Sequence, residues 1–134
     1  MAVVVGYIPT REGRAALERA AAEARLRATT LLVVSSNRGA RDFDAEEARH
    51  FEAALRNIRD QLEMEGVRYE ERSPARGSEP ATDLLAVAEE VDADVIVIGL
   101  RRRSPVGKLL LGSNAQRILL EARCPVLAVK ASGR

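Results

Sequence analysis

Two patterns of apolar residues alternate along this chain. Short runs rich in Val, Ile and Leu are typical of strands in a parallel sheet, because such strands are covered on both faces. Longer stretches, in which apolar residues recur every three or four positions, are typical of helices with one buried face. The runs predict five strands, at residues 2–8, 30–35, 67–72, 94–99 and 125–130. The longer stretches predict four helices, at 11–27, from 42 or 44 to 66, from 78 onward, and at 113–122.

Local signals mark several of these boundaries. Thr10 and Ser78 are placed to cap the first and third helices, and Gly66 is placed to end the second. The strand at 67–72 alternates in polarity and is expected near an edge, whereas 94–99 is the most apolar run and is expected in the centre. The buried side of the last helix is expected to consist of Ala115, Ile118, Leu119 and Ala122.

Strict alternation of strands and helices predicts an α/β fold. Crossovers between parallel strands are right-handed, so the sequence predicts a doubly wound, five-stranded parallel sheet with helices on both faces. No linker or repeat interrupts the pattern, and residues 1–134 are expected to form one domain. In such sheets, ligands bind outside the carboxyl ends of the strands, where the winding reverses. The loops after the first and fourth strands are therefore the places to look for a site.

The composition of the chain argues against several classes of function. The 21 basic and 20 acidic residues are interspersed and leave a net charge of +1, which argues against nucleic acid as the partner. Cys124 is the only cysteine and His50 the only histidine, so neither a disulfide, a His-cluster metal site nor most triad chemistry is expected. The apolar residues 1–7 are too few for a signal peptide or a membrane span. We expect a cytoplasmic protein with no membrane partner.

The segment from Gly99 to Asn114 carries the clearest chemistry. It leaves a central strand and ends at a helix N-terminus, where unpaired N–H groups and the helix dipole favour an anion. Gly112 permits close approach to the backbone, Ser113 adds a hydroxyl, and Arg101, Arg102, Arg103 and Lys108 add positive charge. The segment is neither a Walker A loop, because Leu109 follows Gly107–Lys108, nor a G-x-G-x-x-G fingerprint. A Gly-Ser pair at a helix start is also an ordinary cap, so the motif alone leaves both interpretations open.

The chain resembles the universal stress protein family. Members carry a nucleotide motif of Gly, two residues, Gly, nine residues, then Gly and Ser or Thr. Gly99, Arg102 and Gly112–Ser113 match its spacing, with Arg in place of the second glycine. Further likeness lies in the entry to the third helix (79–85), in the strand 93–99 and in the closing segment 124–129. The resemblance implies a Rossmann-like fold of the adenine nucleotide alpha hydrolase type, with strand order 3-2-1-4-5 and homodimers joined through the last strand, Pro125 to Lys130.

The resemblance also implies an adenine-nucleotide site. Mapped onto this chain, its residues are Pro9, Thr10, Val34, Gly99, Arg101, Arg102, Arg103, Gly112, Ser113 and Asn114. The contact at Val34 is expected through the backbone. Two positions depart from the binding pattern: Ile8 stands where binding members have an Asp, and Arg102 stands for a glycine. The Arg102 guanidinium either blocks the close approach that glycine permits or holds phosphate oxygens itself.

Three functions remain open at this point. The leading hypothesis is a stress-response sensor or regulator that binds ATP, ADP or AMP, with or without Mg²⁺. The second is a nucleotide-free dimer that acts through protein partners, for which Ile8 and Arg102 argue. The third is a slow ATP hydrolase. No acidic residue lies between Gly99 and Gln116, so catalysis would depend on Ser113, Asn114 and a carboxylate from elsewhere, such as Glu12. We assign no catalytic residue and no metal ligand.

Overall fold

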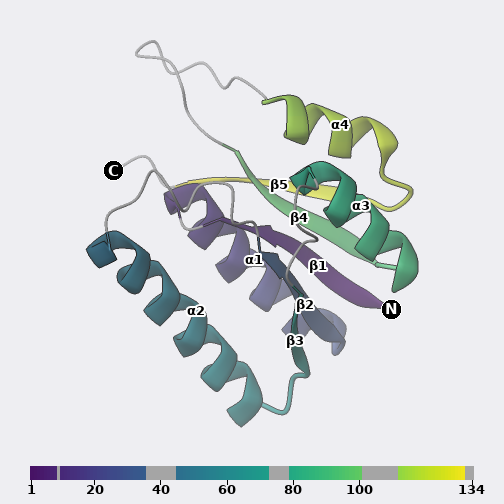
Figure 1. Ribbon diagram of the computed structural model, residues 1–134. Coiled ribbons are helices and arrows are strands. Elements are labelled where there is room, and N and C mark those ends of the chain that lie inside the picture. The colour runs from purple at the N-terminus through teal and green to yellow at the C-terminus, as the bar shows by residue number, and fades with distance from the viewer. Residues whose placement is uncertain (9, 36–44, 73–78, 101–111, 132–134) are drawn as a thin grey trace.

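The computed structural model describes residues 1–8, 10–35, 45–72, 79–100 and 112–131, apart from the side chains of residues 45, 47, 48 and 51. Strands and helices alternate from end to end of this part of the chain (Figure 1). The strands are β1 (Ala2–Tyr7), β2 (Thr30–Ser35), β3 (Tyr69–Arg72), β4 (Val95–Leu100) and β5 (Val126–Lys130). The helices are α1 (Arg11–Arg27), α2 (Ala45–Met64), α3 (Pro80–Glu90) and α4 (Ser113–Glu121).

The strands form one sheet in the order β3-β2-β1-β4-β5, and all four pairings are parallel. The doubly wound, Rossmann-like architecture and the strand order 3-2-1-4-5 are therefore confirmed. The chain winds from β1 toward β3 in one direction and from β4 toward β5 in the other, so the winding reverses between β1 and β4. These two strands pair directly, with Val3 opposite Val95 and Val5 opposite Val97.

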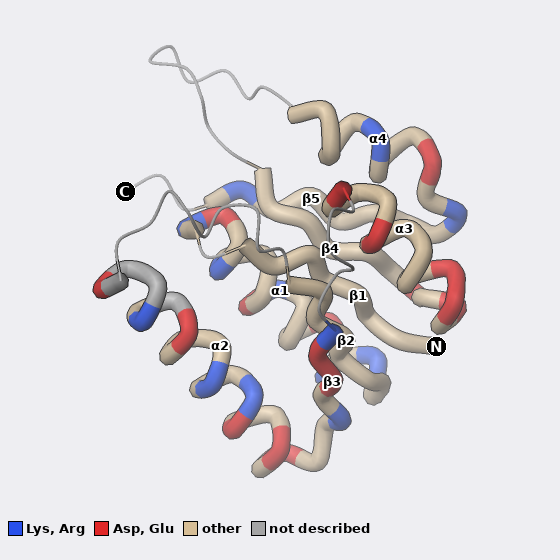
Figure 2. The backbone as a smooth tube through the Cα atoms, viewed as in Figure 1, with Lys and Arg blue, Asp and Glu red and all other residues tan. Residues whose placement is uncertain are grey.

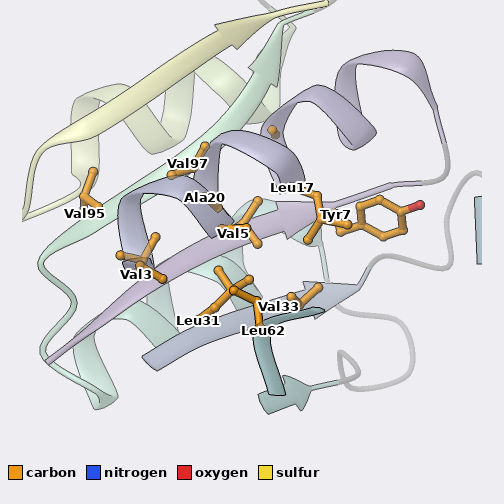
Figure 3. Packing of buried hydrophobic residues seen from close by; sticks show 13 residues of the cluster. Val3, Val5, Tyr7, Leu17, Ala20, Leu31, Val33, Leu62, Val95 and Val97 are labelled. Carbon is orange, nitrogen blue, oxygen red and sulfur yellow. The ribbon is translucent and has the colours of Figure 1, made fainter. Parts of the chain in front are cut away.

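Two apolar layers cover the sheet, one on each face. Alternate residues of β1 divide between them: Val3, Val5 and Tyr7 pack with α1 and with Leu62 of α2, whereas Val4 packs with α3 and α4. Figure 1 shows these two helix pairs on opposite sides of the sheet, and Figure 3 shows the first layer from close by. Because β1, β2 and β4 are covered on both faces, none of them carries a charged residue (Figure 2).

The helix ends follow the predicted signals in two cases. The Thr10 hydroxyl accepts a hydrogen bond from the Gly13 N–H at 3.0 Å, which confirms Thr10 as the cap of α1. Gly66 has a φ of 77° just after α2, and the next N–H, from Val67, donates to the Leu62 carbonyl at 2.9 Å. The N-cap residue of α3 is Glu79 and not the predicted Ser78; the Glu79 side chain makes no capping hydrogen bond but accepts one from Arg117 at 3.5 Å. Ser78 lies outside the described residues, as do residues 42 and 44 at the expected start of the second helix.

The predicted buried face of the last helix is partly wrong. Ile118 is buried, and Ala115 and Ala122 pack against the same layer, but Leu119 is 40% exposed. Leu119 follows Ile118 by about 100° around the helix, and among the described residues α4 packs against α3 and the sheet from one side. In this part of the structure, the buried stripe of α4 is therefore narrower than the one we expected.

Candidate functional site

The carboxyl ends of β1 and β4 meet at the point where the winding reverses, and the turn from β1 into α1 contacts the end of β4 there through Glu12 and Gly99. The N-terminus of α4 lies on the side of the sheet where β4 ends (Figure 1). Of the predicted site residues, this part of the structure contains Thr10, Val34, Gly99, Gly112, Ser113 and Asn114. Pro9, Arg101, Arg102 and Arg103 lie outside the described residues, so their roles stay predictions.

The turn after β1 is wound tightly. The Thr10 N–H donates to the Ile8 carbonyl at 2.8 Å, and the Arg14 N–H donates to the Thr10 carbonyl at 2.9 Å. Gly13 lies against the same turn, and a Cβ atom at this position would lie 1.8 Å from the Ile8 carbonyl oxygen. Only glycine fits there. The N-terminus of α1 is therefore drawn close to the end of β1, and the Thr10 hydroxyl and backbone help to hold it.

Gly99 brings β4 into contact with the same helix turn. A Cβ atom on Gly99 would lie 2.3 Å from the Glu12 carbonyl oxygen and 2.7 Å from the carbonyl carbon. Both atoms belong to the backbone of α1, which has little freedom to move away. The glycine that begins the predicted motif is thus required by the packing of α1 on β4, independently of any ligand.

Gly112 differs from Gly99. It is exposed, with a φ of −67°, and a Cβ atom there would meet no atom of the described residues within 4 Å. It is the N-cap residue of α4, its carbonyl accepts from the Gln116 N–H at 3.0 Å, and it has no side chain to cap the helix. Ser113 is exposed and Asn114 is half-buried. The described part of the fold therefore leaves the space beside Gly112 open.

The N-termini of α1 and α4 differ in electrostatic character. In α1, the Thr10 side chain takes up the Gly13 N–H and the first turn carries the acidic Glu12. In α4, the N-cap residue Gly112 provides no side-chain cap hydrogen bond, and no acidic residue lies in the first turn of the helix. Unpaired N–H groups at a helix N-terminus attract an anion, and a carboxylate in the first turn competes with that attraction. Between the two, α4 offers the better place for a phosphate.

The side chain of Val34 is only 5% exposed and packs in the α3 and α4 layer. Gly6 of β1 lies opposite it in the sheet register. The side chain of Val34 thus belongs to the core, and the backbone contact with a nucleotide that the family resemblance implies for this residue stays a prediction.

Tyr7 is the last residue of β1, and an aromatic ring at this end of the strand is a candidate for stacking on a nucleotide base. Its side chain is 5% exposed and packs in the α1 and α2 layer, with the hydroxyl pointing away from the apolar cluster (Figure 3). Burial raises the pKa of Tyr7 to about 12, an effect that Arg14 opposes and Glu52 reinforces. The ring is thus a packing element of the core.

The described residues also bear on metals and membranes as partners. No group of three or more His, Cys, Asp and Glu side chains comes together there as a metal site. No helix in the described part of the chain is long and apolar enough to cross a membrane.

A groove of about 460 Å³ lies at the amino ends of β2 and β3, beside the Arg25–Glu65 ion pair. It is therefore distant from the reversal point of the sheet.

Two contacts at the carboxyl ends of β1 and β4 were not predicted from the sequence: the contact of Gly13 with Ile8, and that of the Glu12 backbone with Gly99. One signal for Gly13 was available, because a glycine in the first turn of an Ala-rich helix costs helix propensity and calls for a packing reason. The contact between Glu12 and Gly99 joins residues 87 positions apart, and no local pattern reveals it.

The sequence of this chain is similar to those of known proteins. The model of the universal stress protein family matches residues 1–130. A universal stress protein of Mycolicibacterium smegmatis is 46% identical over 131 residues, which cover 98% of each chain. One from Thermus aquaticus is 33% identical and covers 96% of this chain and 97% of its own.

Solved structures agree with these sequence relatives. The universal stress protein from Archaeoglobus fulgidus superimposes with a TM-score of 0.72 at 36% identity, over 97% of this chain and 98% of that one. The structure of the universal stress protein from the same organism in complex with dAMP gives a TM-score of 0.69 at 34% identity, with the same coverage. At this level of identity, the likeness extends beyond the fold to the sequence.

Proposed function

Because this chain belongs to the universal stress protein family, we propose that it binds an adenine nucleotide at the reversal point of its sheet and acts as a stress-response sensor or regulator. The observation that carries the proposal is the N-terminus of α4, which begins at Gly112, a residue without a capping side chain, and has no acidic residue in its first turn. Such a terminus supplies N–H donors and a positive dipole end to a phosphate. The complex of the Archaeoglobus fulgidus protein with dAMP supports the choice of an adenine nucleotide.

In this proposal, the phosphates lie against the first turn of α4, where Ser113 adds a hydroxyl donor. The Gly99–Gly112 segment contributes Arg101, Arg102 and Arg103, whose guanidinium groups bind phosphate oxygens through paired hydrogen bonds. The nucleoside lies nearer β1 and β2 and meets the backbone of Val34. ATP, ADP and AMP share these features, so the proposal covers all three, with or without Mg²⁺.

A second candidate function rests on Ile8. Nucleotide-binding members resembling this chain have an Asp at the matching position, whereas Ile8 has no polar side chain, and its carbonyl accepts from the Thr10 N–H. A chain that has lost this contact could act as a nucleotide-free dimer through protein partners. The order β3-β2-β1-β4-β5 leaves β5 at an edge of the sheet, where its free backbone groups can pair with a second copy. Sedimentation of the wild-type chain tests the dimer: a monomer at all concentrations contradicts it.

The binding test uses nucleotide-stripped protein, titrated calorimetrically with AMP, ATP and GTP. We expect heat from the adenine nucleotides and none from GTP. In Gly112→Val, the added side chain enters the open space beside the α4 N-terminus, so binding should be lost while the fold remains. Leu120→Ala is the matched control, because Leu120 is 84% exposed near the other end of the same helix. Normal binding by Gly112→Val would remove α4 from the site.

A further inference from the structure

Asp83, in the first turn of α3, has a carboxylate oxygen without a partner in the described part of the chain. Its Oδ2 atom is buried and accepts no hydrogen bond there. Most buried polar atoms of side chains are hydrogen-bonded, because burial without a partner gives up the favourable contact with water. The side chain as a whole is half-buried, so part of it faces outward. The carboxylate is therefore a ready acceptor for a donor that a ligand brings.

Helix α3 places Asp83 at the carboxyl edge of the sheet. The other end of the helix lies at the amino edge, where the Val91 carbonyl accepts a hydrogen bond from the N-terminal amino group at 3.0 Å. Near the start of the helix, Leu84 packs on β1, and a Cβ atom built on Gly6 would lie 3.1 Å from its Cδ2 atom. Gly6 is opposite Val34 of β2 in the sheet register. Asp83 therefore precedes a residue that covers the ends of β1 and β2.

The two flanks of α3 face different neighbours. On one flank, the Thr82 hydroxyl accepts a hydrogen bond from Arg117 of α4. On the other flank, Glu90 forms an ion pair with Arg72, the last residue of β3. Asp83 lies seven positions before Glu90, which is about two helical turns, so these two residues share a flank. The Asp83 carboxylate is therefore on the side of α3 that faces β2 and β3, and not on the side of α4.

We infer that Asp83 recognises the base of the bound nucleotide by accepting a hydrogen bond from the adenine amino group. This inference rests on the proposed function, in which the nucleoside meets the backbone of Val34. The amino group of adenine donates hydrogen bonds, whereas the carbonyl oxygen in its place in hypoxanthine and guanine accepts them and is repelled by a carboxylate. Asp83 thus selects adenine through a side-chain acceptor that Ile8, at the end of β1, does not have.

The test compares the dissociation constants of AMP and of IMP, in which a carbonyl replaces the amino group, by calorimetry on nucleotide-stripped protein. For the wild type, we expect AMP to bind about thirtyfold more tightly, because IMP loses a hydrogen bond to a charged group. In Asp83→Asn, the ratio should fall to about one, since a carboxamide can accept from the amino group or donate to the carbonyl. Glu90→Gln is the matched control, because Glu90 is an exposed acid on the same flank of α3. It should keep the wild-type ratio.

The ratio of the two constants separates base recognition from a structural role. Asparagine has nearly the shape of aspartate, so Asp83→Asn should keep the wild-type melting temperature. A wild type that binds AMP and IMP equally, or a ratio that is the same in Asp83→Asn as in the wild type, would overturn the inference while leaving nucleotide binding intact. Absence of binding by AMP, ADP and ATP to the wild type would overturn the proposed function and this inference together.

Discussion

Replacing Gly99 by alanine probes whether this glycine serves the fold or a ligand. The added methyl group would lie 2.3 Å from the Glu12 carbonyl oxygen, whereas ordinary contacts of a Cβ begin at about 3.4 Å. About 1 Å of movement is needed, and it must come from backbone, because the atoms in the way belong to the first turn of α1. Gly112→Ala is the comparison, since its methyl group would meet none of the residues that the structure describes within 4 Å.

The size of the effect follows from overpacking. Extra methyl groups in well-packed regions cost about 1–3 kcal/mol, and a contact with backbone belongs at the upper end of this range. Replacing glycine by alanine returns about 0.4–1 kcal/mol by restricting the unfolded chain. We therefore expect Gly99→Ala to lower the free energy of unfolding by about 2 kcal/mol. For a domain of this size, that is a fall of roughly 7 °C in melting temperature.

Urea unfolding followed by circular dichroism measures both variants without ligand. Gly112→Ala changes an N-cap, where alanine is worse than glycine, so we expect a loss below about 1 kcal/mol. A Gly99→Ala protein as stable as Gly112→Ala would refute the packing role and return Gly99 to the group of ligand-binding glycines. The test is independent of nucleotide binding, so it holds whether or not the proposed function is correct.

Three further predictions concern the turn after β1. Gly13→Ala should destabilise the fold more than Gly99→Ala, because its methyl group would lie 1.8 Å from the Ile8 carbonyl oxygen; urea unfolding that matches the wild type would contradict this. Thr10→Ala removes the cap of α1 and should cost about 1 kcal/mol by the same assay, and an unchanged midpoint would show that the cap is dispensable. Burial raises the pKa of Tyr7 to about 12 from an ordinary value of 10, so the unfolded chain releases the phenolic proton first and stability should fall as the pH rises from 10 to 12. Tyr7→Phe should lessen this fall, and an equally steep loss in that variant would show that Tyr7 does not cause it.

The central strands could be predicted because their residues obey a strong local rule. β1, β2 and β4 are buried on both faces, and uninterrupted Val, Ile and Leu report this directly. Pattern alone did not order the strands, since any order of parallel strands suits the same runs; the order came from the family resemblance and is confirmed. Leu119 was misplaced because helical periodicity gives the direction of a buried face but not its width.

The candidate site was predictable in part. The start of α4 at Gly112 and Ser113 was predicted correctly because a helix N-terminus has a local signature, whereas their role in binding stays a prediction. The packing of Gly99 on Glu12 was not, because it depends on how closely α1 crosses the end of β4, which is a contact between distant parts of the chain. Glycine motifs carry this ambiguity generally: the same residue permits the approach of a ligand or of another backbone, and only the fold shows which one is present.

The most direct test of the account is the melting temperature of nucleotide-stripped protein with millimolar MgATP, with AMP and with GTP. A ligand at 100 times its dissociation constant stabilises the native state by about 2.7 kcal/mol, which is a rise of roughly 5–10 °C for a domain of this size. The account predicts such a rise with the adenine nucleotides and none with GTP. Unchanged melting with every nucleotide would contradict it and would favour the nucleotide-free dimer.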